Sequence, residues 1–194
     1  MHDLHKLTAK EAVDNIKCGK ITCVDLVKDC LNHIDNIDEL VHAWVLIDKD
    51  YAIKQANEVD EKIKQGIDPG YIPGIPIGVK DNFNTHVLPT QMGSSLWSGF
   101  TPENDARAIF NLRMNGGIVM GKTVTAEFAV HTPNGTINPH NSDHIAGTSS
   151  SGSAAAVATF MVPIALASQT AGSIIRPSSF CGVYGFKPSF GIVP

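Results

Sequence analysis

Two serine-rich segments contain the side chains of this sequence that are best suited to chemistry. Residues 147–156 read Gly-Thr-Ser-Ser-Ser-Gly-Ser-Ala-Ala-Ala, and residues 168–182 read Ser-Gln-Thr-Ala-Gly-Ser-Ile-Ile-Arg-Pro-Ser-Ser-Phe-Cys-Gly. Small residues allow a tight backbone in which several amide N–H groups converge on one point, and an oxyanion hole requires that convergence. Residues 171–173 are therefore candidates to direct N–H groups at a carbonyl oxygen while presenting a hydroxyl beside it.

The residue types alone do not identify the base that such a hydroxyl needs. A serine is a weak nucleophile at neutral pH unless a base lies within hydrogen-bond reach. The chain has eight histidines and fifteen Lys+Arg residues, so many candidates remain. The same pattern of glycine and serine is also typical of an ordinary turn.

Longer motifs narrow this choice because they resemble the signature of the amidase-signature hydrolases. Residues 147–188 are similar to that family's Gly-Gly-Ser-Ser-Gly-Gly-Ser-Ala-Ala-Ala block, its Gly-Ser-Ile-Arg block and its Cys-Gly-x-x-Gly-x-Lys-Pro block. Residues 74–82, Gly-Ile-Pro-Ile-Gly-Val-Lys-Asp-Asn, resemble its lysine segment, and Gly121-Lys122-Thr123 with Glu127-Phe128 also fits. The resemblance covers nearly the whole chain.

The resemblance implies a Ser–cis-Ser–Lys triad, which is assigned here by matching motif positions. Ser173 matches the nucleophile, Ser149 matches the bridging serine on a cis peptide, and Lys80 matches the base. Backbone N–H groups of Thr170, Ala171, Gly172 and Ser173 would hold the oxyanion. Ser150 would support the proton relay by hydrogen bonding.

The triad requires a neutral lysine, although the free side chain has a pKa of about 10.4. Burial lowers the pKa of a lysine, and the apolar residues Ile75, Ile77 and Val79 beside Lys80 would favour this. The expected reaction is hydrolysis of a linear carboxamide through an acyl-enzyme on Ser173. Neither a metal nor an organic cofactor is expected, and the expected ligand is a small-molecule amide.

The sequence also departs from the family pattern. Thr148 and Ser151 replace glycines, Gln169 replaces an acidic residue, and residues 174–177 read Ile-Ile-Arg-Pro where the A subunits of tRNA-dependent amidotransferases have Ile-Arg-Gln-Pro. These differences favour a stand-alone amidase over such a subunit. A truncated, inactive member is a further alternative, because family members are normally more than twice this length. Arg176 would meet a substrate carboxylate or, as we favour, pair with an acidic neighbour.

Two other kinds of site have motifs in the sequence. Residues 116–123 match the phosphate-loop pattern G-x-x-x-x-G-K-[ST], but an apolar run lies inside the would-be loop and a predicted helix precedes it. His140 and His144 have the spacing of one helical face, but they lie in a predicted loop, which disfavours a zinc site.

Composition excludes several classes of partner. The formal net charge of −4 disfavours direct binding of nucleic acid, and no apolar run is long enough to cross a membrane. The polar N-terminus lacks the apolar core of a secretion signal, so a cytoplasmic protein with reduced cysteines is expected. The sequence does not indicate an oligomeric state.

Helices that alternate with short apolar strands would position these residues, and they predict an α/β fold. The family resemblance implies a layered α/β/α domain with a mixed sheet, present here incompletely. Residues 1–66 would form a mainly helical lead-in, and residues 70–194 the catalytic core segment. The expected helices are 8–18, 22–34, 48–66, 105–115 and 154–162, and the expected strands are 43–47, 75–79, 118–120 and 164–167.

Overall fold

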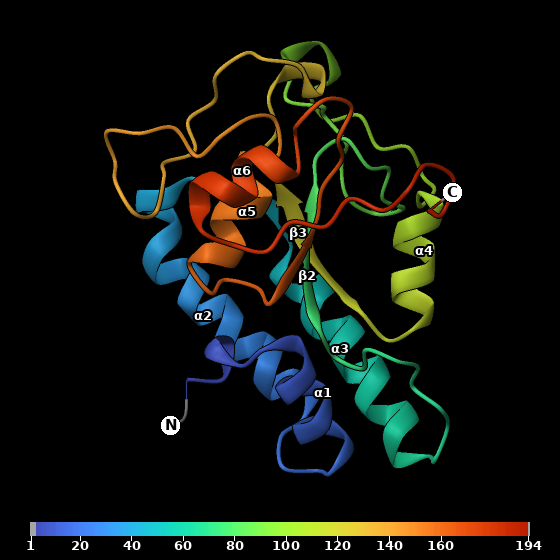
Figure 1. The fold of residues 1–194 in the computed structure, drawn as a ribbon. Coiled ribbons are helices and arrows are strands. Elements are labelled where there is room, and N and C mark those ends of the chain that lie inside the picture. Colours follow the sequence, from blue (N-terminus) through green and yellow to red (C-terminus); the bar gives the residue numbers. More distant parts are fainter. Residues whose placement is uncertain (1–2, 194) are drawn as a thin grey trace.

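The computed structural model describes residues 3–193 and arranges them as a mixed four-stranded sheet with helices packed around it (Figure 1). The strands are β1 (Trp44–Ile47), β2 (Pro76–Lys80), β3 (Ile118–Thr123) and β4 (Ile164–Leu166). The α-helices are α1 (Ala9–Lys17), α2 (Cys23–Val41), α3 (Lys49–Lys64), α4 (Arg107–Met114), α5 (Ser151–Ala158) and α6 (Ile175–Cys181). Short 3-10 turns are η1 (Leu4–Lys6), η2 (Ser95–Trp97) and η3 (Glu127–Ala129). None of the helices within residues 3–193 combines the length and the apolar character that spanning a membrane requires.

The order of the strands, β1-β3-β2-β4, places β2 and β3 at the centre of the sheet, where every residue of both is buried. β2 runs parallel to β3 and to β4, whereas β1 is antiparallel to β3. The register pairs Val79 with Lys122 and Lys80 with Thr123. The carboxyl ends of three parallel strands therefore meet at one edge, and the predicted α/β fold with a mixed sheet is confirmed.

The helices of the N-terminal third begin where the sequence predicts. Thr8 caps α1 and forms a reciprocal capping box with Glu11, and Thr22 forms the same arrangement with Asp25 at the start of α2. Asp48 caps α3 by accepting a hydrogen bond from the N–H of Tyr51. Each cap satisfies N–H groups that the first turn of a helix leaves free.

Two apolar clusters cover the sheet. The larger one joins the buried faces of α1, α2, α3 and α5 to β1 and β3. The smaller one contains Ile77 and Val79 of β2 together with Ile109 of α4. Figure 1 shows α4 on one side of the central strands and α2, α5 and α6 on the other. Trp44 packs into the larger cluster, where its indole N–H donates to Met161 Sδ at 3.0 Å.

Three predicted elements have different bounds in the structure. The helix predicted at 22–34 extends to Val41, because Ile37 and Val41 continue its apolar face against the larger cluster. The strand predicted at 118–120 continues to Thr123, because residues 121–123 pair with both β1 and β2. The helix predicted at 154–162 instead occupies Ser151–Ala158. It begins earlier because the small residues 151–153 fit closely against neighbouring backbone, and it ends earlier because Phe160 has a positive φ of 59°.

Candidate active site

Lys80 is the last residue of β2, and its side chain is completely buried. Its Nζ atom lies 2.7 Å from Ser149 Oγ and 3.0 Å from Ser168 Oγ. Strand alternation directs Lys80 to the face of the sheet opposite Ile77 and Val79. The structure thus brings together two of the three residues that the resemblance assigns to a triad, Lys80 and Ser149.

Ser149 lies in a segment that the surrounding elements hold firmly. The peptide bond from Thr148 to Ser149 is cis, as the resemblance implies for the bridging serine. The Ser149 carbonyl accepts a hydrogen bond of 3.0 Å from the N–H of Ala126, and the Ser149 side chain is completely buried. Gly147 has a φ of +87°, and a Cβ atom there would lie 2.6 Å from Pro177 Cα. The segment therefore packs against α6, directly after the predicted nucleophile.

The burial of Lys80 has an electrostatic consequence. Desolvation lowers the pKa of its ammonium from 10.5 to about 8. Removing an ammonium from water penalises its charged form, so about a tenth of the side chain is neutral at pH 7 and about half at pH 8. A neutral amine 2.7 Å from a hydroxyl can accept its proton.

Ser168 and Asn82 complete the surroundings of Lys80, although sequence reasoning did not select them. Ser168 Oγ accepts a hydrogen bond of 2.8 Å from Asn82 Nδ2, and its carbonyl accepts one of 3.3 Å from Ser150 Oγ. Ser150 thus reaches Lys80 through Ser168 rather than directly. Asn82 Oδ1 is buried and has no hydrogen-bond partner among the described residues.

A topological signal could have identified Ser168. Ser168 directly follows the predicted strand 164–167, just as Lys80 directly follows the predicted strand 75–79. Residues that follow parallel neighbouring strands meet at the same edge of a sheet, where open α/β sheets bind their ligands.

Ser173 lies in the turn before α6 and is half-buried. Within residues 3–193, its hydroxyl forms no hydrogen bond with Ser149 or Lys80, so the structure does not close the triad. The N–H groups of residues 170–173 likewise have no acceptor in this part of the chain. They are arranged in a turn beside the Ser173 hydroxyl, and they remain the predicted oxyanion donors.

Gln169 organises this turn through its side-chain amide. Its Oε1 atom accepts hydrogen bonds from the N–H groups of Ile174 and Ile175 at 2.9 and 3.0 Å. Its Nε2 atom donates to the Ala171 carbonyl at 3.0 Å. An uncharged amide thus joins both ends of the turn that carries Ser173.

Arg176 is exposed on the first turn of α6. Its Nη1 atom donates to Thr148 Oγ1 at 3.3 Å. The acidic partner that we favoured from the sequence is absent among residues 3–193, since none of the ion pairs found there includes Arg176. Its guanidinium lies close to Gly172, next to the predicted nucleophile.

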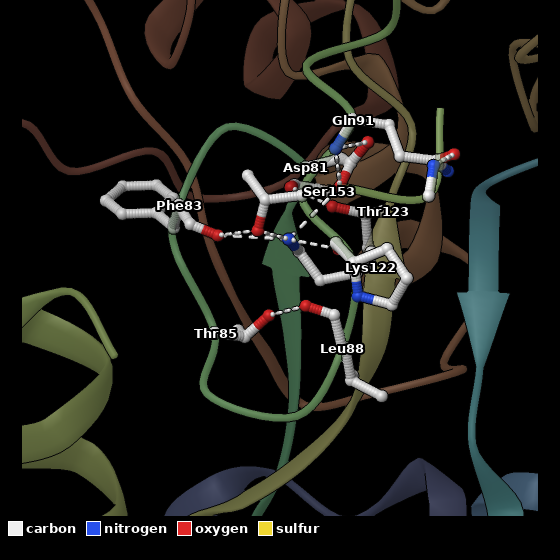
Figure 2. Close-up of polar contacts among 11 residues, drawn as sticks. Asp81, Phe83, Thr85, Leu88, Gln91, Lys122, Thr123 and Ser153 are labelled. Atoms are coloured by element: carbon white, nitrogen blue, oxygen red, sulfur yellow. Dashed lines mark hydrogen bonds and ion pairs between the residues drawn. The ribbon is translucent and has the colours of Figure 1, made fainter. Parts of the chain in front are cut away.

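The phosphate-loop pattern of residues 116–123 does not form a phosphate loop. Residues 118–123 of this pattern form strand β3, and Lys122 is completely buried. The Lys122 ammonium lies 3.1 Å from Asp81 Oδ1, and it donates to Thr90 Oγ1 at 2.8 Å and to the Phe83 carbonyl at 3.0 Å. Figure 2 shows Lys122 directed toward Asp81 and Phe83 inside the molecule. The ammonium is saturated by protein atoms, so the sequence alternative of a nucleotide-binding loop is rejected.

The histidines that are spaced for a metal do not form a metal site. In the described part of the chain, no three His, Cys, Asp or Glu side chains are grouped closely enough to hold an ion. His140 Nε2 instead lies 2.8 Å from the Cys181 carbonyl, which ties the 132–148 loop to α6.

Comparison with known families adds a decisive observation. A family model described as Amidase matches residues 25–194. The chain belongs to the amidase signature family. The match includes each residue that the sequence resemblance assigned to the site.

Curated relatives include A subunits of glutamyl-tRNA(Gln) amidotransferase. The subunit from Carboxydothermus hydrogenoformans is 38% identical over 98% of this chain, and the subunit from Agathobacter rectalis is 41% identical over 98%. The chain spans 41% and 39% of their lengths, respectively.

Solved structures show the same fold. Peptide amidase from Stenotrophomonas maltophilia superposes with a TM-score of 0.90 at 32% identity over 97% of this chain, and a bacterial aryl acylamidase with a TM-score of 0.92 at 28% identity over 97%. The chain covers 41% and 40% of those two proteins. The described residues therefore have the amidase-signature fold over a segment that is about two-fifths of each relative.

Proposed function

We propose that this chain carries the catalytic residues of an enzyme that cleaves the carbon–nitrogen bond of a carboxamide. The observation that supports this most is the buried contact of 2.7 Å between Lys80 Nζ and Ser149 Oγ. Lys80, at the end of β2, has a pKa of about 8 and can act as a base, and the Ser149 hydroxyl lies where it can relay a proton to Lys80. Ser173 is the proposed nucleophile, at the start of the helix against which the Ser149 segment packs.

The proposed reaction begins when neutral Lys80 accepts the proton of Ser149, which in turn accepts the proton of Ser173. The Ser173 oxygen then bonds to the amide carbon, and the N–H groups of Thr170, Ala171, Gly172 and Ser173 stabilise the oxyanion. As the carbon–nitrogen bond breaks, Ser149 returns a proton to the leaving amine. Water attacks the resulting ester by the same relay, which releases a carboxylic acid and restores Ser173. Ser150 supports the relay by sharing the Ser168 carbonyl with Lys80.

The curated relatives favour the A subunit of a tRNA-dependent amidotransferase as the setting for this chemistry. They are 38% and 41% identical to this chain over nearly its whole length, which supports the amidotransferase subunit. The departures at residues 174–177 favour a stand-alone amidase instead, but they are weaker support. In such a complex the same acyl-enzyme forms, and the nitrogen passes to an acceptor instead of leaving as free ammonia.

We propose that the chain binds a small-molecule carboxamide and does not itself bind nucleic acid or a membrane. A cytoplasmic location is part of the same proposal.

We further propose that residues 1–194 are the N-terminal portion of one amidase-signature domain, with a helical lead-in at 1–66 and a catalytic core segment at 70–194. The coverage of about 40% of each relative supports this. Activity must therefore be measured in this chain and in any longer protein that contains it.

Labelling with a fluorophosphonate probe tests the site without knowledge of the substrate. We expect one adduct on Ser173, identified by mass spectrometry, which the Ser173→Ala variant loses. Ser179→Ala is a matched control, since Ser179 is an exposed serine on α6 and should have no effect. Labelling that survives in Ser173→Ala would disprove the assignment of the nucleophile, and no labelling of the wild type would favour an inactive member.

Analysis of the reaction products distinguishes a stand-alone amidase from an amidotransferase subunit. A stand-alone amidase releases a carboxylate and an amine from simple linear carboxamides when no other protein is present. An amidotransferase subunit transfers the nitrogen only when its partner subunits and acceptor are supplied. Turnover of a carboxamide panel by the isolated protein, at a rate that partner subunits do not change, would contradict the amidotransferase setting.

A further inference from the structure

Lys122 and Asp81 form an ion pair inside the molecule, one residue away from the proposed base. Their side chains are 0% and 1% exposed, and Lys122 Nζ lies 3.1 Å from Asp81 Oδ1. The proposed reaction does not use either residue. Breaking a buried ion pair is costly because it leaves an uncompensated charge, so this pair needs an explanation.

The pair fixes the backbone that immediately follows Lys80. The N–H of Asp81 donates to the Thr123 carbonyl at 3.0 Å, which extends the β2–β3 ladder. The Asp81 carbonyl accepts from the N–H of Met92 at 2.9 Å, and its carboxylate accepts from the N–H of Gln91 at 3.2 Å. Asp81 is therefore held through its N–H, its carbonyl and its carboxylate.

Lys122 fastens the other end of the same loop. Its ammonium donates to the carbonyls of Phe83 and Pro89, each at 3.0 Å, and to Thr90 Oγ1 at 2.8 Å (Figure 2). The loop that runs from Asp81 to Met92 thus closes around one buried cation. Lys80, the last residue of β2, directly precedes this closed loop, and its side chain reaches Ser149.

Neighbouring residues of a strand point to opposite faces, which separates the two lysines. Lys80 contacts Ser149 and Ser168 on one face, whereas Lys122, which pairs in register with Val79, contacts Asp81 on the other. α5 and β4 contain no ionisable side chain, and α6 contains Arg176, which contacts Thr148, and Cys181, whose thiol donates to the Ala146 carbonyl. The charges nearest to Lys80 along β2 and β3 are therefore Asp81 and Lys122, which neutralise each other.

We propose that Asp81 and Lys122 are positioning residues, which fix the end of β2 so that Lys80 meets Ser149 and which leave no unbalanced charge beside Lys80. This inference rests on the proposed function. A displacement of about 1 Å of a reacting group can lower a rate roughly a hundredfold. Loss of either partner should therefore lower kcat and leave KM nearly unchanged.

A double-mutant cycle tests the pair. Lys122→Met and Asp81→Asn preserve side-chain volume and remove one charge each, and we expect each to lower kcat about 10- to 100-fold with less than a twofold change in KM. Because the pair acts as a unit, the double variant should lose less than the product of the two single losses. Asp60→Asn is the matched control, since Asp60 is a buried carboxylate that accepts from the N–H groups of Cys23 and Val24 at the start of α2 and not from the residues around Lys80. It should lower Tm without lowering kcat.

An NMR titration provides a readout that is independent of turnover. The chemical shift of the Lys80 side-chain Cε, assigned with Lys80→Arg, reports the protonation of Lys80 in the folded protein. Asp81→Asn leaves an unbalanced cation, which should move the Lys80 midpoint to lower pH. Lys122→Met leaves an unbalanced carboxylate, which should move it to higher pH, and the double variant should return it towards the wild type.

The kinetic measurements and the NMR titration together distinguish a failure of this inference from a failure of the proposed function. If the wild type hydrolyses no amide, the titration still tests the positioning pair. Additive losses of kcat, an equal loss in Asp60→Asn, or a Lys80 midpoint that is unchanged in both folded single variants would overturn the proposal.

Discussion

The two sides of the candidate site differ in how the chain holds them. The base side, formed by Lys80, Ser149 and Ser168, lies among the central strands, and its lysine and bridging serine are completely buried. The nucleophile side, residues 169–176, is half-buried or exposed and is organised by the amide of Gln169. Substitutions on the base side should therefore change the proton transfer itself, whereas those on the nucleophile side, apart from Ser173 itself, should mainly loosen a turn.

The base side and the nucleophile side also differ in how closely the rest of the chain packs around them. The base side is packed between the sheet and α5, where Ser153 Oγ lies 2.7 Å from Thr123 Oγ1 and donates to the Leu166 carbonyl at 2.9 Å. Beyond α6, by contrast, Tyr184, Phe186 and other apolar side chains are largely exposed. A cavity of about 1030 Å³ lies between this C-terminal segment, α5 and β4. The described residues thus enclose the base far more completely than the proposed nucleophile.

Among substitutions that keep Ser173, Lys80→Met should have the largest effect, since it removes the base but keeps most of the side-chain volume. We expect turnover to fall by about 10³-fold or more, because general-base catalysis contributes roughly 10²- to 10⁴-fold and no other base contacts Ser149 within residues 3–193. The measurement is kcat on the best carboxamide of a panel. Wild-type turnover in this variant would remove the base side from the mechanism.

Ser149→Ala should be the next most damaging substitution. It interrupts the relay but leaves Lys80 and Ser173 in place, so we expect kcat to fall about 100-fold and KM to change less. Ser151→Ala is a suitable control, because the Ser151 hydroxyl contacts Asn134 and Thr136 and not Lys80. If Ser149→Ala has an unchanged kcat, the proton does not pass through Ser149.

The pH dependence should reflect the base side alone. Because the folded-state pKa of Lys80 is about 8, kcat/KM should rise about tenfold between pH 7 and pH 9 as the ammonium loses its proton. A depressed lysine pKa also means that the unfolded state binds more protons. Stability should therefore rise with pH from about 8 towards the free value near 10.4, and this contribution should be absent in Lys80→Met. A rate that is flat over this range would contradict the lysine base.

Gln169 provides a smaller test on the nucleophile side. Gln169→Leu leaves the N–H groups of Ile174 and Ile175 without their acceptor, and we expect roughly a tenfold loss of kcat as the turn loosens. Gln169→Glu keeps both acceptor contacts and loses only the bond to the Ala171 carbonyl, so it should retain more activity. The opposite ranking, measured side by side, would show that the turn does not depend on those two contacts.

Arg176→Ala should have the smallest effect on the fold. The side chain is exposed and has one long contact to Thr148 Oγ1, so the free energy of unfolding should change by less than about 0.5 kcal/mol. If Arg176 binds a substrate carboxylate, KM should rise for amides that carry a carboxylate and not for neutral amides. Equal KM changes for both classes would exclude that role.

The sequence predicts the site unevenly, for physical reasons. Apolar runs between glycines and prolines mark strands 75–79 and 164–167, so the edge where Lys80 emerges is predictable. The assignment of Lys80 as the base required a family resemblance. Its contact with Ser168 depends on the parallel pairing of β2 with β4, which no local pattern encodes. Lys122 was not predicted as a core residue because lysine is rarely buried, and only the tertiary fold supplies the carboxylate and carbonyls that make its burial possible.

The packing of Trp44 makes the base side visible to fluorescence. Its ring lies under β2, where a Cβ atom at Gly78 would be 3.3 Å away, and it is 9% exposed. The other tryptophan, Trp97, is 38% exposed and lies against Phe100. A Trp97→Phe protein therefore has a single indole emitter, whose ring packs beside Gly78, two residues before Lys80 in β2. Its emission maximum reports whether water has entered the sheet at that point, so the integrity of the base can be followed in real time during a reaction.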